Sequence, residues 1–167
     1  GGELCIGDRV IPKHSGNTLK ILGAHLGMRG QTVLAVQQRI RAAWHYWGQR
    51  RHIFTAKVVG RRQRLRLMSR LLGAVVLWGK ESWCLTQREI DEMNGAHVRM
   101  ARQTLVLSRI WAEFPERYHQ RTFREARRWL DELGIERWGD RALALHHRWA
   151  GHVGRHRTLL RDAVHHR

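Results

Sequence analysis

Residues 32–47 have the sequence TVLAVQQRIRAAWHYW. Apolar side chains recur in this stretch at spacings of three and four, at Val33, Val36, Ile40, Ala43, Trp44 and Trp47. This period places them on one face of an α-helix, which turns once every 3.6 residues. The stretch therefore predicts an amphipathic helix and points to a mainly α fold.

Four further helices follow from the same period. We expect them over residues 56–78, from a capping box at residues 86–89, over residues 116–133, and from Trp138 onward. In the capping box, the Thr86 hydroxyl and the Glu89 carboxylate satisfy free amides of the first helical turn. Pro115 separates two helices, and Gly134 is expected to end the fourth. The residues expected in the core are Leu65, Met68, Leu72, Val75, Val76, Ile90, Met93, Met100, Ala101, Leu105, Phe123, Ala126, Leu130, Leu133, Trp138, Ala142, Leu145 and Trp149.

The first residues carry extended-structure signals instead. Short apolar runs flank Gly7-Asp8, a dipeptide suited to a hairpin turn, and residues 18–26 form a second strand candidate. We therefore predict a mainly α fold, with a short N-terminal β-hairpin or strand element followed by a bundle of about five helices. The expected divisions are a β element over residues 1–28, a helical bundle over residues 29–110, and a basic helical region over residues 111–167.

The charge of the chain points to a polyanionic partner. Lys and Arg number 31 against 14 Asp and Glu, a formal charge of +17, and only four of the basic residues are lysines. The planar guanidinium binds phosphate through a fork of donors and stacks on bases. Nucleic acid is the commonest polyanion, so it is the leading candidate. A coding bias that inflates Arg throughout the chain is the alternative.

Several classes of protein are disfavoured by the sequence. Cys5 and Cys84 are far apart and form no CxxC pair, which argues against a zinc ribbon or a disulfide scaffold. Apolar runs of membrane-spanning length and a signal-peptide pattern are both missing from the sequence. The chain opens Gly-Gly-Glu, and we expect it to be a piece of a longer protein.

Candidate catalytic and metal sites are weak. Gly79-Lys80 follows Gly73 at the wrong spacing for a phosphate-binding loop, and Glu81 replaces the hydroxyl residue that such a loop needs. The C-terminal histidines lack a suitably spaced carboxylate, so surface histidines are the simpler interpretation. The carboxylates form no paired-aspartate signature for two metal ions. We expect no catalytic residue, metal or cofactor in this chain.

Arginines are the candidate binding residues. Two stripes at helical spacing contain one sign of charge only, namely Arg62, Arg66 and Arg70, and Arg117, Arg121, Arg124 and Arg128. A solvated surface would instead show mixed signs, and like charges four residues apart cost a few tenths of a kcal/mol (roughly) per pair. Bound phosphates would offset that cost. We predict nucleic-acid contacts from both stripes and from Lys20, Arg39, Arg41 and Lys57.

Four motifs follow one another along the chain, TLKILGAHL at residues 18–26, RIRAAW at 39–44, LWGKESWCLT at 77–86 and RWAGHVGR at 148–155. In this order they resemble motifs of LINE-type (non-long-terminal-repeat) retrotransposon reverse transcriptases. Residues 18–26, TLKILGAHL, resemble the family's "FKYLG" strand, and residues 39–44, RIRAAW, resemble its "RI..A" helix start. Residues 77–86, LWGKESWCLT, are similar to "LYGAETWTLT", with Trp78 for the usual Tyr and Lys80 for a small residue. Residues 148–155, RWAGHVGR, are similar to "RWLGHVARM". The resemblance covers about residues 4–157.

The resemblance implies a location within a polymerase. Residues 1–28 would be the end of the palm, with Leu22 and Gly23 near the primer end, and residues 29–110 would be the thumb. Gly79, Glu81 and Trp83 would form a helix-end corner with Trp78 and Trp83 packed, and Trp149, Gly151 and His152 would belong to the C-terminal signature. The implied partners are a template–primer duplex, gripped by its backbone, and the upstream palm and fingers of the same polyprotein.

The family's catalytic Tyr-x-Asp-Asp turn is missing from this sequence. The resemblance therefore implies that the catalytic aspartates and their Mg²⁺ belong to an upstream palm, and that this chain alone does not polymerise DNA. It also implies an intracellular nuclear or cytoplasmic ribonucleoprotein. The main alternative is a stand-alone basic helical module that scaffolds RNA–protein assembly. Membrane association through basic amphipathic helices is a third, weaker possibility.

Overall fold

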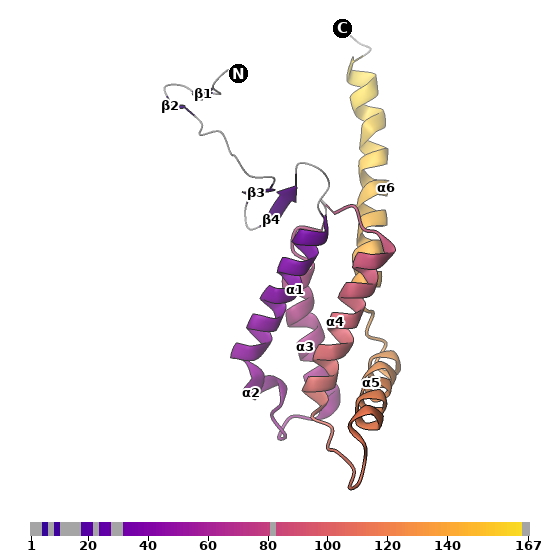
Figure 1. Ribbon diagram of the computed structural model, residues 1–167. Helices are drawn as coiled ribbons and strands as arrows, with labels where there is room; N and C mark the ends of the chain where they lie inside the picture. The colour runs from indigo at the N-terminus through magenta and orange to yellow at the C-terminus, as the bar shows by residue number, and fades with distance from the viewer. Residues whose placement is uncertain are drawn as a thin grey trace.

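Figure 1 shows the computed structural model of the chain. The structure describes side chains over residues 32–80 and 83–151, and beyond these only the backbone of four short strands and of the last helix. The strands, paired β1–β2 and β3–β4, are β1 (Cys5–Ile6), β2 (Arg9–Val10), β3 (Thr18–Ile21) and β4 (Ala24–Gly27). The helices are α1 (Thr32–Gln49), α2 (Arg51–Phe54), α3 (Arg61–Val76), α4 (Gln87–Leu105), α5 (Pro115–Glu132) and α6 (Trp138–Val164). The chain is mainly helical, as predicted. The N-terminal β element stays a prediction, because its side chains lie outside the described residues.

Helices α1, α3 and α4 pack side by side, and α5 and α6 pack against α4 (Figure 1). Val36, Ile40, Ala43 and Trp47 on α1 are buried as the helical period predicted, while Trp44 is partly buried beside them. Residues of α5 and α6 belong to the same core as those of α1, α3 and α4. The predicted division of the chain after residue 110 is not tested by this packing alone.

The second predicted helix is shorter than expected. Residues 56–60 form a turn, the four-residue helix α2 precedes it, and α3 begins only at Arg61. Gly60 adopts an extended conformation at the N-cap of α3, with φ −58° and ψ 146°. From there the prediction holds, because Leu65, Met68, Leu72 and Val76 are buried on one face.

Both predicted helix-boundary signals of α4 and α5 are confirmed. The capping box at the start of α4 is formed, and the Thr86 amide donates to Glu89 Oε2 at 2.8 Å. At the end of α5, Gly134 has φ +60°. The Ile135 amide donates to the Leu130 carbonyl at 2.9 Å and the Gly134 amide to that of Asp131 at 3.0 Å. These two bonds are the Schellman motif, which satisfies carbonyls that the helix leaves free.

Thr104, near the end of α4, joins three helices. Its hydroxyl accepts a hydrogen bond from Trp47 Nε1 of α1 at 3.2 Å, and its carbonyl accepts one from Arg64 Nη1 of α3 at 3.0 Å. Arg64 is 5% exposed, and burial is the first cause that lowers its pKa, followed by the nearby charge of Arg61. A guanidinium at this position complements the negative end of the α4 dipole. Arg64 is therefore a structural arginine within the basic helix α3.

The start of α6 is inserted into the bundle. Trp138 is 1% exposed, stacks on His97 of α4 and donates to the Ser69 carbonyl of α3 at 3.4 Å. The next residue, Gly139, donates its amide to Asn94 Oδ1 at 2.8 Å. A Cβ at Gly139 would lie 2.8 Å from that same oxygen and against the Ile90 carbonyl, so α4 and α6 approach more closely than a side chain allows.

Two predictions about tryptophans are wrong. Trp149 is 45% exposed and does not join the core, because α6 has passed the bundle at that point. Gly151 lies inside α6. Trp78, expected to be packed, is 57% exposed, whereas Trp83 is 3% exposed and packed as predicted. Gly79 between them has φ +77°, just after the end of α3, so the predicted helix-end corner is present.

Candidate nucleic-acid interface

The α3 stripe consists of Arg62, Arg66 and Arg70, one helical turn apart. All three side chains are exposed. Successive members are displaced by about 6 Å along the helix axis, because each residue adds about 1.5 Å. The neighbouring arginine Arg64 turns into the core, as its hydrogen bond to Thr104 requires. Helix α3 thus uses one of its five arginines, Arg64, for stability and presents the other four, the stripe and Arg61, to solvent.

An open depression lies beside the α3 stripe. It is lined by Gly60, Arg61, Arg62, Gln63 and Arg66 of the α3 end and by Trp129 of α5. The depression therefore combines guanidinium groups with an indole ring. This combination can hold a phosphate and an adjoining planar group at the same time.

The α5 stripe is not of one sign, contrary to the sequence prediction. Arg121 binds Glu113 through Nε to Oε1 and Nη2 to Oε2, both at 2.8 Å. Arg128 contacts Glu125 at 2.8 Å and Glu132 at 3.4 Å. The folded chain brings Glu113 from the preceding loop to the stripe, and Glu125 and Glu132 lie three and four residues from Arg128 on the same helix. Two of the four predicted binding arginines are therefore neutralised locally.

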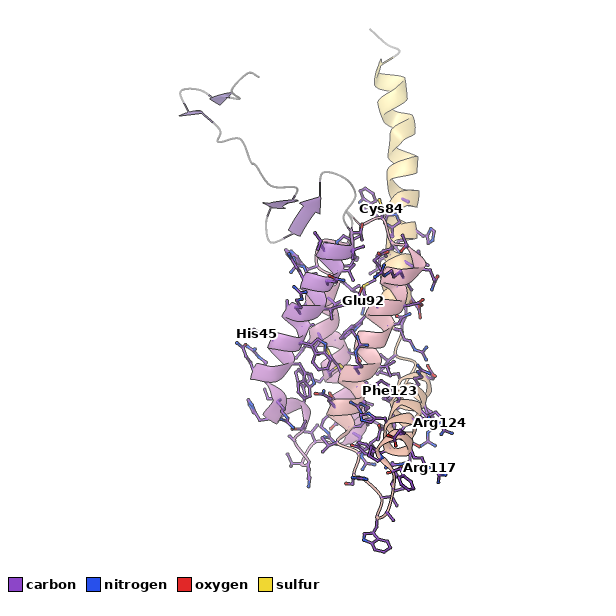
Figure 2. All side chains as sticks on the ribbon, in the orientation of Figure 1. His45, Cys84, Glu92, Arg117, Phe123 and Arg124 are labelled. Atoms are coloured by element: carbon purple, nitrogen blue, oxygen red, sulfur yellow. The ribbon has the colours of Figure 1, made fainter. Side chains whose placement is uncertain are left out.

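Arg117 and Arg124 remain exposed on the outer side of α5 (Figure 2). They line a second depression together with Glu113, Gln120, Arg121 and Glu125. None of the ion pairs found among residues 32–80 and 83–151 includes either arginine. These two residues are the members of the α5 stripe that could meet phosphate.

Glu113, in the loop before α5, and Arg121 of α5 form an ion pair with two hydrogen bonds. Hydrogen bonds from Arg121 are the main cause that lowers the pKa of Glu113 to about 2, and the same bonds raise the pKa of Arg121. Arg121 Nη2 also donates to the Ser108 carbonyl at 2.9 Å, and Arg109 Nε donates to the Glu113 carbonyl at 2.8 Å. The Ile110 amide donates to Glu113 Oε2 at 3.2 Å. Residues 108–113 are thus held by charged hydrogen bonds.

The remaining predicted contacts are dispersed. Arg41 and Lys57 are exposed, while Arg39 is partly buried and burial lowers its pKa. The side chains of Lys20, Leu22, Gly23, Glu81 and His152 lie outside the described residues. Gly151 is exposed on α6. The structure therefore does not gather all the predicted positions on one surface.

One signal in the sequence is stronger than either stripe. Residues 9–80 contain no Asp or Glu, although Lys and Arg recur throughout them. Helices α1, α2 and α3 consequently have no carboxylate of their own to balance Arg41, Arg51 and Arg61, which are all exposed. An uneven charge distribution along the chain would have pointed to this half of the bundle before the structure was known.

Other kinds of site find no support among the side chains that are described. Within residues 32–80 and 83–151, histidines, cysteines and carboxylates form no group of three or more that could hold a metal ion. Over the described part of the chain, none of the helices combines the length and apolarity needed to cross a membrane. The pair Ser69–His97, with Oγ and Nε2 2.9 Å apart, belongs to the core, since Ser69 is 7% and His97 0% exposed.

Comparisons of the chain with protein-family models, with curated proteins and with solved structures find no match.

Proposed function

We propose that the helical body binds nucleic acid through the sugar-phosphate backbone, with α3 as the principal contact. The observation that carries this proposal is the exposure of Arg62, Arg66 and Arg70 in a segment, residues 9–80, that has no carboxylate. Unbalanced arginines repel one another and are stabilised by a polyanion. Contacts of this kind position a nucleic acid without reading its sequence.

The α5 helix makes a smaller contribution in this proposal. Arg121 and Arg128 are bound to carboxylates, so Arg117 and Arg124 are the α5 residues assigned to phosphate. Trp129 lies in the same depression as Arg62 and Arg66 and thereby connects the two helices. Binding is therefore centred on α3 and extends to one side of α5.

We further propose that the chain is the thumb and C-terminal region of a LINE-type reverse transcriptase. The support is the order of the four sequence motifs, together with the helix-end corner at Gly79 and the packed Trp83 in the third of them. Residues 1–28 would then complete the palm as a β element. The catalytic aspartates and Mg²⁺ would belong to upstream sequence, the partner would be a template–primer duplex, and the assembly would be an intracellular ribonucleoprotein.

The proposal is tested by comparing two triple variants, R62Q/R66Q/R70Q and R88Q/R99Q/R141Q. The control residues Arg88, Arg99 and Arg141 are also exposed but lie on α4 and α6, so each variant removes the same charge. We expect the α3 variant to weaken binding to every duplex sequence alike and to reduce the slope of log affinity against log salt by about 0.9 per lost phosphate contact on B-DNA. The control should retain most of the affinity and the slope.

Equal losses in the two variants would show that only total charge matters and would overturn the assignment to α3. A loss confined to one base sequence would instead indicate a sequence-reading protein. The coding sequence upstream of residue 1 tests the family assignment separately. A palm with paired aspartates supports it, whereas a start codon directly upstream favours the stand-alone RNA-scaffolding module.

A further inference from the structure

Two loops lie together at one end of the bundle. Residues 55–60 lead into α3, and residues 106–114 follow α4. The hydrogen bond from Arg64 to the Thr104 carbonyl, 3.0 Å long, joins the beginning of α3 to the end of α4. Both loops are therefore at the same end, the lower end in Figure 1. We call this end, comprising residues 55–62 and 106–114, the tip.

The tip exposes an unusual set of apolar side chains. Trp111 and Val58 are each 95% exposed, Phe114 is 66% exposed and Ile110 is 59% exposed. A fully exposed tryptophan forgoes a large amount of hydrophobic burial, and large apolar side chains exposed at one end of a molecule are typical of a binding surface. The tip is at the opposite end of α3 from the other highly exposed tryptophan, Trp78.

Hydrogen bonds define the conformation of the turn that presents Trp111. The Glu113 amide donates to the Ile110 carbonyl at 3.1 Å, which closes a turn with Trp111 and Ala112 at its centre. Ala112 has φ +60°, a left-handed conformation that costs an L-residue free energy. The bonds from Arg109 and Arg121 described above hold this turn against α5. The backbone at Trp111 is thus held in place, and its indole is almost fully exposed.

Basic side chains lie on the first of the two tip loops and continue along α3. Lys57, Arg61 and Arg62 are exposed on the first loop and the start of α3, and Arg66 and Arg70 continue up α3. A flat membrane could touch the end of the bundle but not a row of charges that runs along its side. A linear polyanion can contact both. The arrangement therefore favours nucleic acid over a lipid surface as the occupant.

We infer that Trp111 stacks on an unpaired base of a nucleic acid whose backbone lies along the α3 arginines. This inference rests on the proposed function and specifies the part of the ligand that the tip binds. Proteins that bind single strands combine a basic surface for the backbone with aromatic rings for the bases, and such stacking tolerates any base. The part of the ligand at the tip is thus unpaired, a single strand or a frayed end beside the duplex, and it is bound without sequence preference.

The test uses the full chain with W111A, W111F and the control W78A, which removes an exposed tryptophan from the other end. Binding is measured to a single-stranded oligonucleotide, to a blunt closed duplex, and to an oligonucleotide carrying 2-aminopurine, whose fluorescence falls on stacking. We expect W111A to weaken single-strand binding by roughly 5- to 150-fold, the range for loss of one stacked base. W111F should retain most of the affinity, W78A should match the wild type, and duplex binding should change less than about twofold.

Loss of 2-aminopurine quenching in W111A, with unchanged thermal unfolding, completes the expected result. The inference would be overturned if W111A bound single strands as tightly as the wild type, or if it lost affinity without any change in quenching. An equal loss of affinity in W78A would overturn it as well. Vesicles of phosphatidylserine and phosphatidylcholine form a further arm. Vesicle binding that W111A abolishes, with oligonucleotide binding intact, would make the tip a membrane contact. A wild-type chain that binds no nucleic acid at low salt would instead contradict the proposed function itself.

Discussion

His97 of α4 stacks face to face on Trp138 of α6, with ring centroids 4.2 Å apart and ring planes within 4° of each other. The imidazole is 0% exposed, and its Nε2 lies 2.9 Å from the Ser69 hydroxyl. A single histidine therefore connects three helices through stacking and one hydrogen bond. Because this ring is removed from water, its protonation and the stability of the bundle are coupled.

As pH falls, His97 should destabilise the bundle at a higher pH than the carboxylates do. Burial, followed by the charge of Arg137, lowers the pKa of His97 from 6.5 to about 3. Below pH 6.5 the histidine is protonated in the unfolded chain but stays neutral in the folded chain. The stabilisation that is present above pH 6.5 is therefore lost as pH falls toward about 3. We expect a loss of about 1.4 kcal/mol in the free energy of unfolding per pH unit within this window. Chemical denaturation at pH 7, 6 and 5 measures it.

The variant H97F provides the control for this effect. Phenylalanine keeps a stacking ring but cannot titrate. Between pH 6.5 and 5, the free energy of unfolding of H97F should therefore fall less steeply than that of the wild type, by most of the about 1.4 kcal/mol per pH unit. This difference in slope is expected whatever the stability of H97F at pH 7. Identical pH dependence in wild type and H97F would show that other groups cause the acid sensitivity.

Gly139 should not tolerate a methyl group. A Cβ there would lie 2.8 Å from Asn94 Oδ1 and against the backbone of Ile90. We expect G139A to lower the free energy of unfolding by about 1–3 kcal/mol, because α6 must move away from α4. G48A is the matched control, since a Cβ at Gly48 of α1 meets nothing within 4 Å. It should be neutral or stabilising by up to about 1 kcal/mol in thermal or urea unfolding. A G139A protein as stable as G48A would refute the close contact.

Thr104 should contribute through its hydroxyl rather than its shape. T104V keeps the volume of the side chain but leaves the buried Trp47 indole without its acceptor at 3.2 Å. We expect a loss of about 1–3 kcal/mol in the free energy of unfolding. T122V serves as the comparison. Thr122 is also fully buried, but its hydroxyl donates only to carbonyls of its own helix, at Tyr118 and His119. The T104V loss should be the larger, and the reverse order would contradict this role.

Replacement of Val106 by glycine should stabilise the bundle. It caps α4 with φ 49° and ψ 55°, a left-handed conformation that is unfavourable for a β-branched residue. The side chain is 44% exposed, so its removal loses little burial. We expect V106G to raise the free energy of unfolding by about 0.5–1 kcal/mol, the relief of strain less the added freedom of the unfolded chain. V106A retains a Cβ and should stay near the wild type. Destabilisation by V106G alone would argue against the left-handed cap.

The helical core could be predicted because it follows from local periodicity. Leu65, Met68 and Leu72 repeat at helical spacing and are buried, as are Ile90, Met93 and Met100. The boundaries at Thr86 and Gly134 were also predictable, since capping and left-handed termination depend on residues within one turn. Trp149 was misplaced because its spacing continues the pattern of α6 beyond the point where any helix remains to cover it.

The candidate interface was only partly predictable. Exposure of Arg62, Arg66 and Arg70 follows from their position beside the apolar stripe of α3. Neutralisation of Arg121 did not follow, because Glu113 reaches it from a loop eight residues earlier, outside helical spacing. The exposed turn at Trp111 likewise depends on Arg109 and Arg121, and indoles of this type are buried elsewhere in the same chain, as at Trp47 and Trp83.

From the sequence alone it follows that the chain is mainly helical, that helix boundaries fall at Thr86 and Gly134, and that residues 9–80 carry positive charge without a carboxylate. These properties depend on residue type and near neighbours. The packing of the helices determines which arginines remain exposed to a ligand, that Arg64 hydrogen-bonds the end of α4, and that residues 55–62 and 106–114 lie at one end. Those relationships join residues tens of positions apart, and only the packing of whole helices brings them within hydrogen-bonding distance.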